Sequence, residues 1–203
     1  MIVDWSGCRN ARDLGGLPTA DGRRVREGAL FRSGSHERLT ATTVAAVRRG
    51  GVGRVVDLRG RTECGEQPSP FVGESVYQNV PMVAEVLAYV PPPDTYAPML
   101  DGHRRRIGAA FRAVVEAPPG TVVVHCQAGR DRTGVLVALL LSVAGVAPER
   151  VADEYARTEG CDPGTMLNTV AHLEDRYGGV AAYLTGSGVA PAQLEEVRRR
   201  LVG

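Results

Sequence analysis

The stretch TVVVHCQAGRDRTG, residues 121–134, decides the fold of this chain. Residues 121–124 are all β-branched, which is typical of a central strand in a parallel sheet. A loop containing Gly129 follows, and an apolar run from Thr133 to about Ala144 predicts a buried helix. A strand that enters a helix through such a loop indicates an α/β fold.

The regions outward from this stretch repeat the same alternation. Further strands are predicted at residues 30–32, 52–58 and, more weakly, 75–80. Helices are predicted at residues 40–49, 99–116, 148–157, 163–177, 180–184 and 191–201, with a loop over 81–98. Pro148, Pro163 and Pro191 each stand where a helix should begin. We therefore expect a mostly parallel sheet flanked by helices, with a helical C-terminal half and ligands at the carboxyl ends of the strands.

The composition is that of an ordinary globular protein. The 203 residues are 43% hydrophobic and 23% charged, with a net charge of +1, and they predict a single domain over residues 1–203. All 24 basic residues are Arg, so any side-chain cation that grips an anion is a guanidinium or a histidine. The near-zero net charge favours neither nucleic-acid binding nor stable membrane association.

The cysteines favour a reducing compartment. Cys8, Cys64, Cys126 and Cys161 lie far apart, which fits neither a disulfide scaffold nor a zinc site. The N-terminus lacks a signal-peptide pattern, and the apolar run 134–147 is too short to span a bilayer. We expect a cytoplasmic protein.

The loop after the central strand has the chemistry of an oxyanion site. The N-terminus of a helix leaves backbone N–H groups unpaired and carries a positive partial charge. Gly129 allows the loop to curl, so that the N–H groups of residues 127–132 can surround one tetrahedral anion. Arg132 can add a bidentate contact, and the Thr133 hydroxyl can donate toward the Cys126 sulfur. The substrate-binding residues predicted here are Gln127, Ala128, Gly129, Arg130 and Thr133.

A thiolate in this setting predicts one reaction. The positive field favours the thiolate form of Cys126, which attacks the phosphorus of a bound ester. Water then hydrolyses the phosphocysteine, while N–H groups and Arg132 stabilise the equatorial oxygens. Because these groups absorb the charge, no metal and no cofactor is expected.

The motif His125-Cys-x5-Arg-Thr133 resembles the signature of the Cys-based protein tyrosine phosphatase superfamily. The longer pattern HCQAGRDRTG is similar to the bacterial tyrosine phosphatase branch that also holds a secreted mycobacterial tyrosine/lipid phosphatase. Other matching segments are Asn10–Gly16, Leu30–Ser33, Val56–Arg59 with Glu63, Ala152–Tyr155 and the stretch from Tyr177 to Leu184, so the resemblance covers essentially the whole chain.

The sequence does not decide which residue is the general acid. The resemblance implies a catalytic role for Asp131, which can also be a carboxylate that only orients Arg130 or Arg132. Asp94 has the spacing of the acid in dual-specificity phosphatases. Glu85 stands near the place where some relatives carry an Asp. We rank Asp131 first, then Asp94, then Glu85.

Several polar residues are expected near the site. Asp57 and Arg59 end a parallel strand and either line the pocket or form an internal ion pair. His125 is expected to be a buried hydrogen-bonding residue that tunes the loop. Arg12 and Asp13 are expected to stabilise a turn as a pair.

The predicted function is a metal-independent phosphatase. Its substrate is a phosphorylated protein, above all on tyrosine, with phosphoserine, phosphothreonine, a phosphoinositide or a small phosphate ester as further possibilities. The alternative is a phosphate-binding module with little turnover, because an Asp is missing near Pro81. Oxidation of Cys126 is a third role that the reactive thiolate suggests. The sequence leaves the oligomeric state open.

Overall fold

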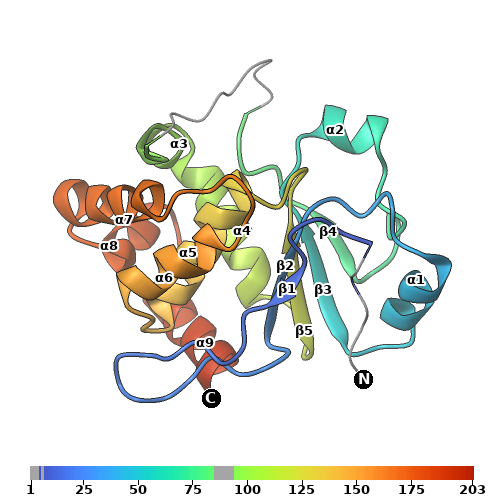
Figure 1. Ribbon diagram of the computed structural model, residues 1–203, viewed down its shortest axis with the longest axis horizontal. Helices are drawn as coiled ribbons and strands as arrows, with labels where there is room; N and C mark the ends of the chain where they lie inside the picture. The colour runs from blue at the N-terminus through green and yellow to red at the C-terminus, as the bar shows by residue number, and fades with distance from the viewer. Residues whose placement is uncertain (1–4, 6, 85–93) are drawn as a thin grey trace.

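A five-stranded sheet forms the centre of the molecule in the computed structural model, which describes residues 5, 7–84 and 94–203 (Figure 1). Its strands are β1 (Arg12–Asp13), β2 (Leu30–Ser33), β3 (Val52–Asp57), β4 (Tyr77–Asn79) and β5 (Thr121–His125). Their order is β1-β2-β5-β3-β4, with β1 antiparallel to β2 and every other pairing parallel. The β-branched strand is therefore central, as its sequence predicts.

Nine helices are assigned within the described residues. They are α1 (Ala41–Arg48), α2 (Arg61–Glu66), α3 (Ala97–Gly102), α4 (Arg104–Val115), α5 (Asp131–Val143), α6 (Pro148–Ala156), α7 (Pro163–Tyr177), α8 (Val180–Gly186) and α9 (Pro191–Val202). The prolines of α6, α7 and α9 each occupy the first helical position, as predicted. The helical C-terminal half is thus confirmed.

The two faces of the sheet are covered by different elements. Side chains alternate along a strand, so Val122 and Val124 of β5 enter the large core shared with the C-terminal helices. Val123 faces the other way and joins a smaller core with Trp5, Phe71 and Val47 of α1. In Figure 1, α1 lies on one side of the strands and α4–α9 lie on the other. The predicted α/β class with a flanked parallel sheet is confirmed.

Some predicted elements differ from the observed ones. The single helix expected over 99–116 is two helices that meet at His103, because Gly102 lowers the helical propensity at the junction. Helix α5 begins at Asp131, two residues before the predicted start at Thr133. The elements β1 and α2 were not predicted. β1 has two residues, and α2 buries none of its residues and has no apolar face.

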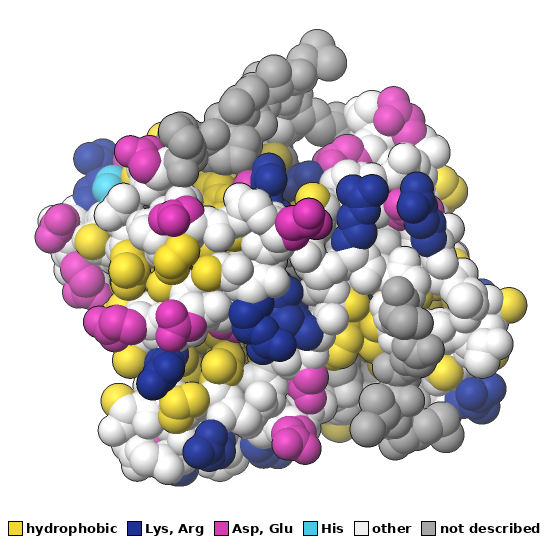
Figure 2. All heavy atoms as spheres, viewed as in Figure 1, with side chains coloured by type: hydrophobic (Ala, Val, Ile, Leu, Met, Phe, Trp, Pro, Cys, Tyr) yellow, Lys and Arg dark blue, Asp and Glu magenta, His cyan; other side chains and the backbone are white. Residues whose placement is uncertain are grey.

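The surface carries no dominant charge on the face shown in Figure 2. Dark-blue Arg side chains are interspersed there with magenta Asp and Glu side chains. No helix in the described part of the chain combines the length and the apolar character needed to cross a membrane. The run that includes residues 134–143 is instead the buried helix α5.

The carboxyl ends of β2, β3 and β5 meet at one edge of the sheet. Backbone hydrogen bonds tie their loops together there: Leu58 N donates to His125 O at 2.8 Å, and Ser35 N donates to Gln127 O at 3.0 Å. Helix α2 lies above this edge in Figure 1. The loop after β5 is therefore surrounded by the loops after β2 and β3.

Candidate active site

The loop between β5 and α5 turns its carbonyl groups outward. Each has a protein partner outside the loop: Cys126 O faces His125 Nδ1 at 3.3 Å, Gln127 O accepts from Ser35 N at 3.0 Å, Ala128 O from Asn10 Nδ2 at 2.8 Å, and Gly129 O from Arg32 Nη2 at 2.7 Å. In a planar trans peptide the following N–H points opposite to the carbonyl. The N–H groups of residues 127–130 are therefore directed toward the inside of the loop, as an anion cradle requires.

Gly129 makes the curl of this loop possible. Its φ of +69° lies in the left-handed region, where side chains are strained. A Cβ atom at this position would lie 2.6 Å from the backbone of Ser33 and Gly34. The close approach of β2 to the loop therefore requires glycine on two independent grounds.

A cluster of buried ion pairs between side chains holds the loop in place. Glu154 of α6 accepts from Arg32 Nη1 at 2.7 Å and from Arg12 Nε at 2.7 Å. Arg32 Nη2, the second terminal nitrogen of the same guanidinium, donates to Gly129 O at 2.7 Å. Arg12 also reaches the backbone oxygen of Glu154 and the Thr158 hydroxyl, each at 2.9 Å. Helix α6, far along the chain, thereby fixes the position of the loop.

The expected pairing of Arg12 with Asp13 is wrong in part. Asp13 does stabilise a turn, since its carboxylate accepts from Gly15 N at 3.0 Å and from Gly28 N at 2.7 Å. Arg12 points instead to Glu154, because adjacent residues of a strand project to opposite faces.

Cys126 lies at the floor of the loop. The residue is almost completely buried, with 2% of its surface exposed. Thr133, in the first turn of α5, is fully buried, and its hydroxyl oxygen has no hydrogen-bond partner among the described residues. A buried polar atom without a partner is unusual, and here it stands in the same turn as Arg132.

Arg132 is held by Glu63 of α2. Its Nη1 and Nη2 atoms donate to Glu63 Oε2 and Oε1 at 2.5 and 2.7 Å. Burial acts against the charged form of Glu63, but the hydrogen bonds from Arg132 and Gly60 N outweigh it and lower the pKa of this carboxyl. The pairing uses one N–H on each terminal nitrogen, so three of the five guanidinium N–H groups are left for a ligand.

Two stacked histidines lie beneath the loop. The rings of His36 and His125 are 3.9 Å apart at an angle of 24°, and both residues are almost completely buried. Burial lowers the pKa of His125, and burial together with His125 lowers the pKa of His36 well below its ordinary value. His36 Nε2 contacts the Ser33 hydroxyl at 3.0 Å. His125 is thus a buried residue that contacts the loop through Cys126 O, as the sequence predicts.

Asp57 and Arg59 form an internal ion pair, the second of the two alternatives given above. Both are fully buried, and Arg59 Nη2 donates to Asp57 Oδ2 at 2.7 Å. Burial opposes the charge on Asp57, but His125 and Arg59 outweigh it and lower the pKa of the carboxyl. His125 Nε2 lies 3.5 Å from the same oxygen, so the pair braces the end of β5.

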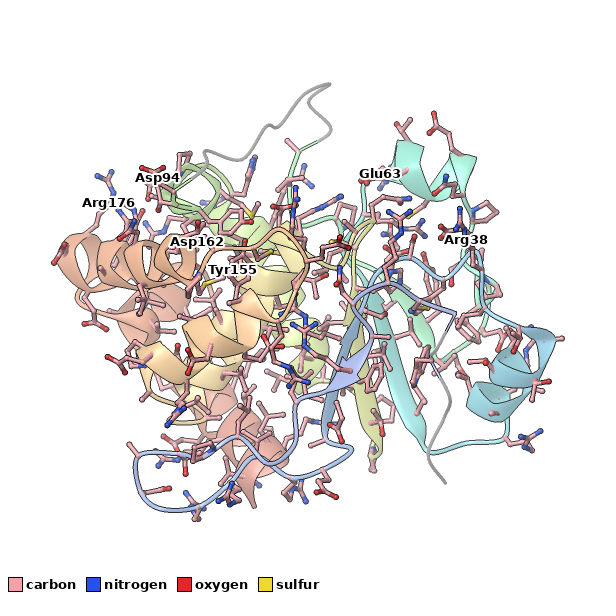
Figure 3. All side chains as sticks on the ribbon, viewed as in Figure 1. Arg38, Glu63, Asp94, Tyr155, Asp162 and Arg176 are labelled. Carbon is pink, nitrogen blue, oxygen red and sulfur yellow. The ribbon has the colours of Figure 1, made fainter. Side chains whose placement is uncertain are left out.

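Asp131 begins α5 and is bound by tyrosine. Its Oδ1 atom accepts from the Tyr96 hydroxyl at 2.5 Å, and Tyr96 contacts the Tyr155 hydroxyl at 2.7 Å. Arg130 Nε lies 3.3 Å from both carboxylate oxygens. Figure 3 shows Glu63 on the α2 side of the loop and Tyr155 on the side of α6.

The other two acid candidates are placed differently. Asp94 is exposed, and its backbone oxygen accepts from Asn168 Nδ2 of α7 at 3.0 Å. Figure 3 shows it beside α3, at the end of the helical layer. Glu85 lies outside the described residues. The structure therefore brings Cys126, Asp131, Arg132 and Thr133 together in one loop and helix turn.

Several supporting residues had no assigned role in the sequence. Glu63 and Glu154 lie within segments that resemble the family but have no local pattern that marks a function, and Tyr96 and His36 carry no local signal. Glu63, Glu154 and Tyr96 act through hydrogen bonds to residues 35 or more positions away. His36 acts by stacking on His125. No group of three or more His, Cys, Asp or Glu side chains suited to a metal ion occurs in the described part of the chain.

Comparisons with known proteins agree with this geometry. A model of the tyrosine phosphatase family matches residues 3–162. The chain is 32% identical over 199 residues to a protein of Cupriavidus necator assigned as a tyrosine-protein phosphatase, an alignment that spans 91% of this chain and 69% of the relative. It is 24% identical to the tyrosine-protein phosphatase of Nostoc commune, covering 85% of this chain and 74% of that protein. It is also 24% identical to the triple specificity protein phosphatase PtpB of Mycobacterium tuberculosis, covering 87% and 76%. The chain belongs to the tyrosine phosphatase family and is a cysteine-based phosphatase.

Proposed function

We propose that Cys126 is the nucleophile of this phosphatase and that the reaction passes through a phosphocysteine. The observation that carries the proposal is the set of outward carbonyl groups over residues 126–129, which directs the N–H groups of the loop inward. A phosphate monoester seated there is held by N–H groups and by the free N–H groups of Arg132.

The first step forms the covalent intermediate. The Cys126 thiolate attacks phosphorus, the S–P bond forms, and the bond from phosphorus to the ester oxygen breaks. The leaving alcohol takes a proton from an acid, for which Asp131 is the first candidate, followed by Asp94 and Glu85. Arg132 and the loop N–H groups stabilise the charge on the three equatorial oxygens.

The second step releases phosphate. A water attacks phosphorus, gives its proton to the group that acted as acid, and the S–P bond breaks with its electron pair returning to Cys126. The Thr133 hydroxyl, which has no hydrogen-bond partner among the described residues, supports this step, because it can donate to the departing thiolate. Inorganic phosphate and the free enzyme result.

Phosphotyrosine is the proposed substrate, with phosphoserine, phosphothreonine and phosphoinositides as further substrates. The triple specificity of the mycobacterial relative supports this breadth. Arg130, whose side chain is 43% exposed beside the loop, can contact a second anionic group. A kinetic comparison of phosphopeptides and phosphoinositides at matched concentration ranks these classes by kcat/KM.

The whole chain is proposed to act as one phosphatase domain in the cytoplasm. The large core contains residues from Leu14 to Val202, which supports a single unit. A reducing compartment keeps the sulfur of Cys126 in the reduced state from which the thiolate nucleophile forms. The family and its named relatives give no support to a phosphate-binding module without turnover.

The test replaces Cys126 by serine. We expect Cys126→Ser to bind phosphate but to hydrolyse p-nitrophenyl phosphate at least about 1,000-fold more slowly, since the covalent step is lost. Cys8→Ser is the matched control, because Cys8 is a buried free cysteine in the smaller core. Wild-type turnover by the Cys126 variant would contradict the proposal.

A further inference from the structure

We propose that Tyr96 and Tyr155 are positioning residues that orient Asp131 by holding its Oδ1 atom, so that proton transfer takes place at Oδ2, which has the longer contact of 3.3 Å with Arg130 Nε. The inference rests on the proposed role of Asp131 and adds two residues to the machinery of the reaction. It starts from a chain of three polar groups, Tyr155–Tyr96–Asp131, with contacts of 2.7 and 2.5 Å.

The direction of this chain follows from the proton count. A phenol has one proton, and the Tyr96 hydroxyl donates it to Asp131 Oδ1. The contact between the two hydroxyls then requires Tyr155 to donate to the Tyr96 oxygen. Both donors therefore point toward Asp131, and the second donor strengthens the first.

Both phenols remain protonated throughout the working pH range. Tyr96 is 2% exposed and Tyr155 is 3% exposed. Burial raises the pKa of Tyr96, and the hydrogen bonds to Asp131 and Tyr155 raise it further. Burial also raises the pKa of Tyr155, with a contribution from Cys161. The pair thus acts as a fixed donor rather than as a proton acceptor.

The two rings are held in place by three helices and a hydrogen bond. Their centroids are 6.1 Å apart at 85°, an edge-to-face arrangement. Tyr96 N donates to the Thr169 hydroxyl of α7 at 2.8 Å. The Tyr155 ring lies against Gly134 of α5 so closely that a Cβ there would be 2.9 Å from two ring atoms. Asp131 is therefore oriented by two side chains from outside the loop, which are held by contacts with α5, α6 and α7.

Packing alone does not account for the hydroxyl groups. Phenylalanine would fill the same apolar space, whereas two buried hydroxyls cost free energy unless they are paired. Here the terminal acceptor that pairs them is the carboxylate at the start of α5. The charged or titratable groups that face this carboxylate are Tyr96, Tyr155, Arg130, Arg132 and Cys161.

The decisive variants are Tyr96→Phe and Tyr155→Phe, compared with Asp131→Asn. We expect Tyr96→Phe to lower kcat roughly 10-fold with KM unchanged, as loss of one hydrogen bond to a charged group implies. The limb of the kcat–pH profile that Asp131→Asn abolishes should move to higher pH, because the ionised carboxylate loses a donor. Tyr155→Phe should shift it less in the same direction. The double variant Tyr96→Phe/Asp131→Asn should be no slower than Asp131→Asn.

Tyr177→Phe is the matched control, since the Tyr177 hydroxyl donates to Asp101 Oδ1 at 2.6 Å away from the loop. Its pH profile should equal that of the wild type. If Tyr96→Phe does not fold, Tyr155→Phe carries the test, because its hydroxyl is one step further from Asp131. Full activity of Asp131→Asn would overturn the proposed acid/base role. If Asp131→Asn is impaired but the pH profiles of both tyrosine variants are unshifted, the present inference is overturned while the proposed role of Asp131 stands. The same holds if the effects of Tyr96→Phe and Asp131→Asn on kcat are additive.

Discussion

Glu63 holds both terminal nitrogens of Arg132, at 2.5 and 2.7 Å, so the guanidinium of the loop is fixed before any substrate binds. The carboxylate also accepts from Gly60 N at 2.8 Å, which fixes Glu63 to the first turn of α2. A short helix that packs no core residue therefore orients the phosphate-binding cation.

Glu63→Gln should weaken this orientation. The amide keeps the size of the side chain but loses its charge and one of its acceptor oxygens, so we expect kcat/KM to fall about 10- to 100-fold. Glu74→Gln is the control, because Glu74 accepts from Nε and Nη2 of Arg48 at 2.9 and 2.6 Å on the surface. Steady-state kinetics on p-nitrophenyl phosphate compare the two variants; equal, small effects would show that Glu63 does not position Arg132.

Gly129→Ala should disrupt the loop itself. The added Cβ would meet the backbone of β2 at 2.6 Å, in addition to the strain of a φ of +69°. We expect loss of phosphate binding and a fall in kcat of more than about 100-fold, as displaced oxyanion donors imply. Gly160→Ala tests the backbone strain without the steric clash, because Gly160 has a φ of +73° but a Cβ there would have no neighbouring atom within 4 Å. An active Gly129→Ala variant would contradict the close packing of loop and strand.

Glu154→Gln should destabilise the fold more than it alters chemistry. It leaves Arg12 and Arg32 without their buried counter-charge, and removal of one partner from a buried ion pair costs about 3–5 kcal/mol. Asp153→Asn, one residue away on the same helix and paired with Arg150 on the surface, should cost less than about 1 kcal/mol. Urea unfolding at pH 7 measures both; a loss below about 1 kcal/mol for Glu154→Gln would refute the bracing role.

The stacked histidines predict a pH-dependent stability. The folded-state pKa of His36 lies well below its ordinary value of 6.5, so the unfolded chain binds the proton first as the pH falls. The contribution of these histidines to the free energy of unfolding is therefore fully present above about pH 6.5. It decreases below that pH, by at most about 1.4 kcal/mol per pH unit for each histidine.

His36→Phe keeps an aromatic ring against His125 and removes one titrating group. Its unfolding free energy should depend less steeply on pH between about 5.5 and 6.5 than that of the wild type, by roughly 1 kcal/mol per pH unit. An unchanged slope in His36→Phe would show that His36 is protonated in the folded state.

The sequence by itself determined the elements whose cause is local. Four β-branched residues before His125 and Cys126 predict the central strand, Gly129 predicts the curl, and the apolar run after Thr133 predicts the buried helix. The prolines at 148, 163 and 191 mark helix starts, because proline lacks the N–H that the first turn leaves unused. The order Cys–Gly–Arg–Thr in one loop also places the candidate nucleophile and its cation without any knowledge of the rest.

Only the tertiary structure decided what surrounds that loop. Glu63 reaches Arg132 across 69 positions, Arg32 reaches Glu154 across 122, and Tyr96 reaches Asp131 across 35. Residues so far apart leave no periodicity or spacing by which to pair them. Their pairing follows from the parallel sheet, which brings the carboxyl ends of β2, β3 and β5 to one edge, and from the helices that pack against it.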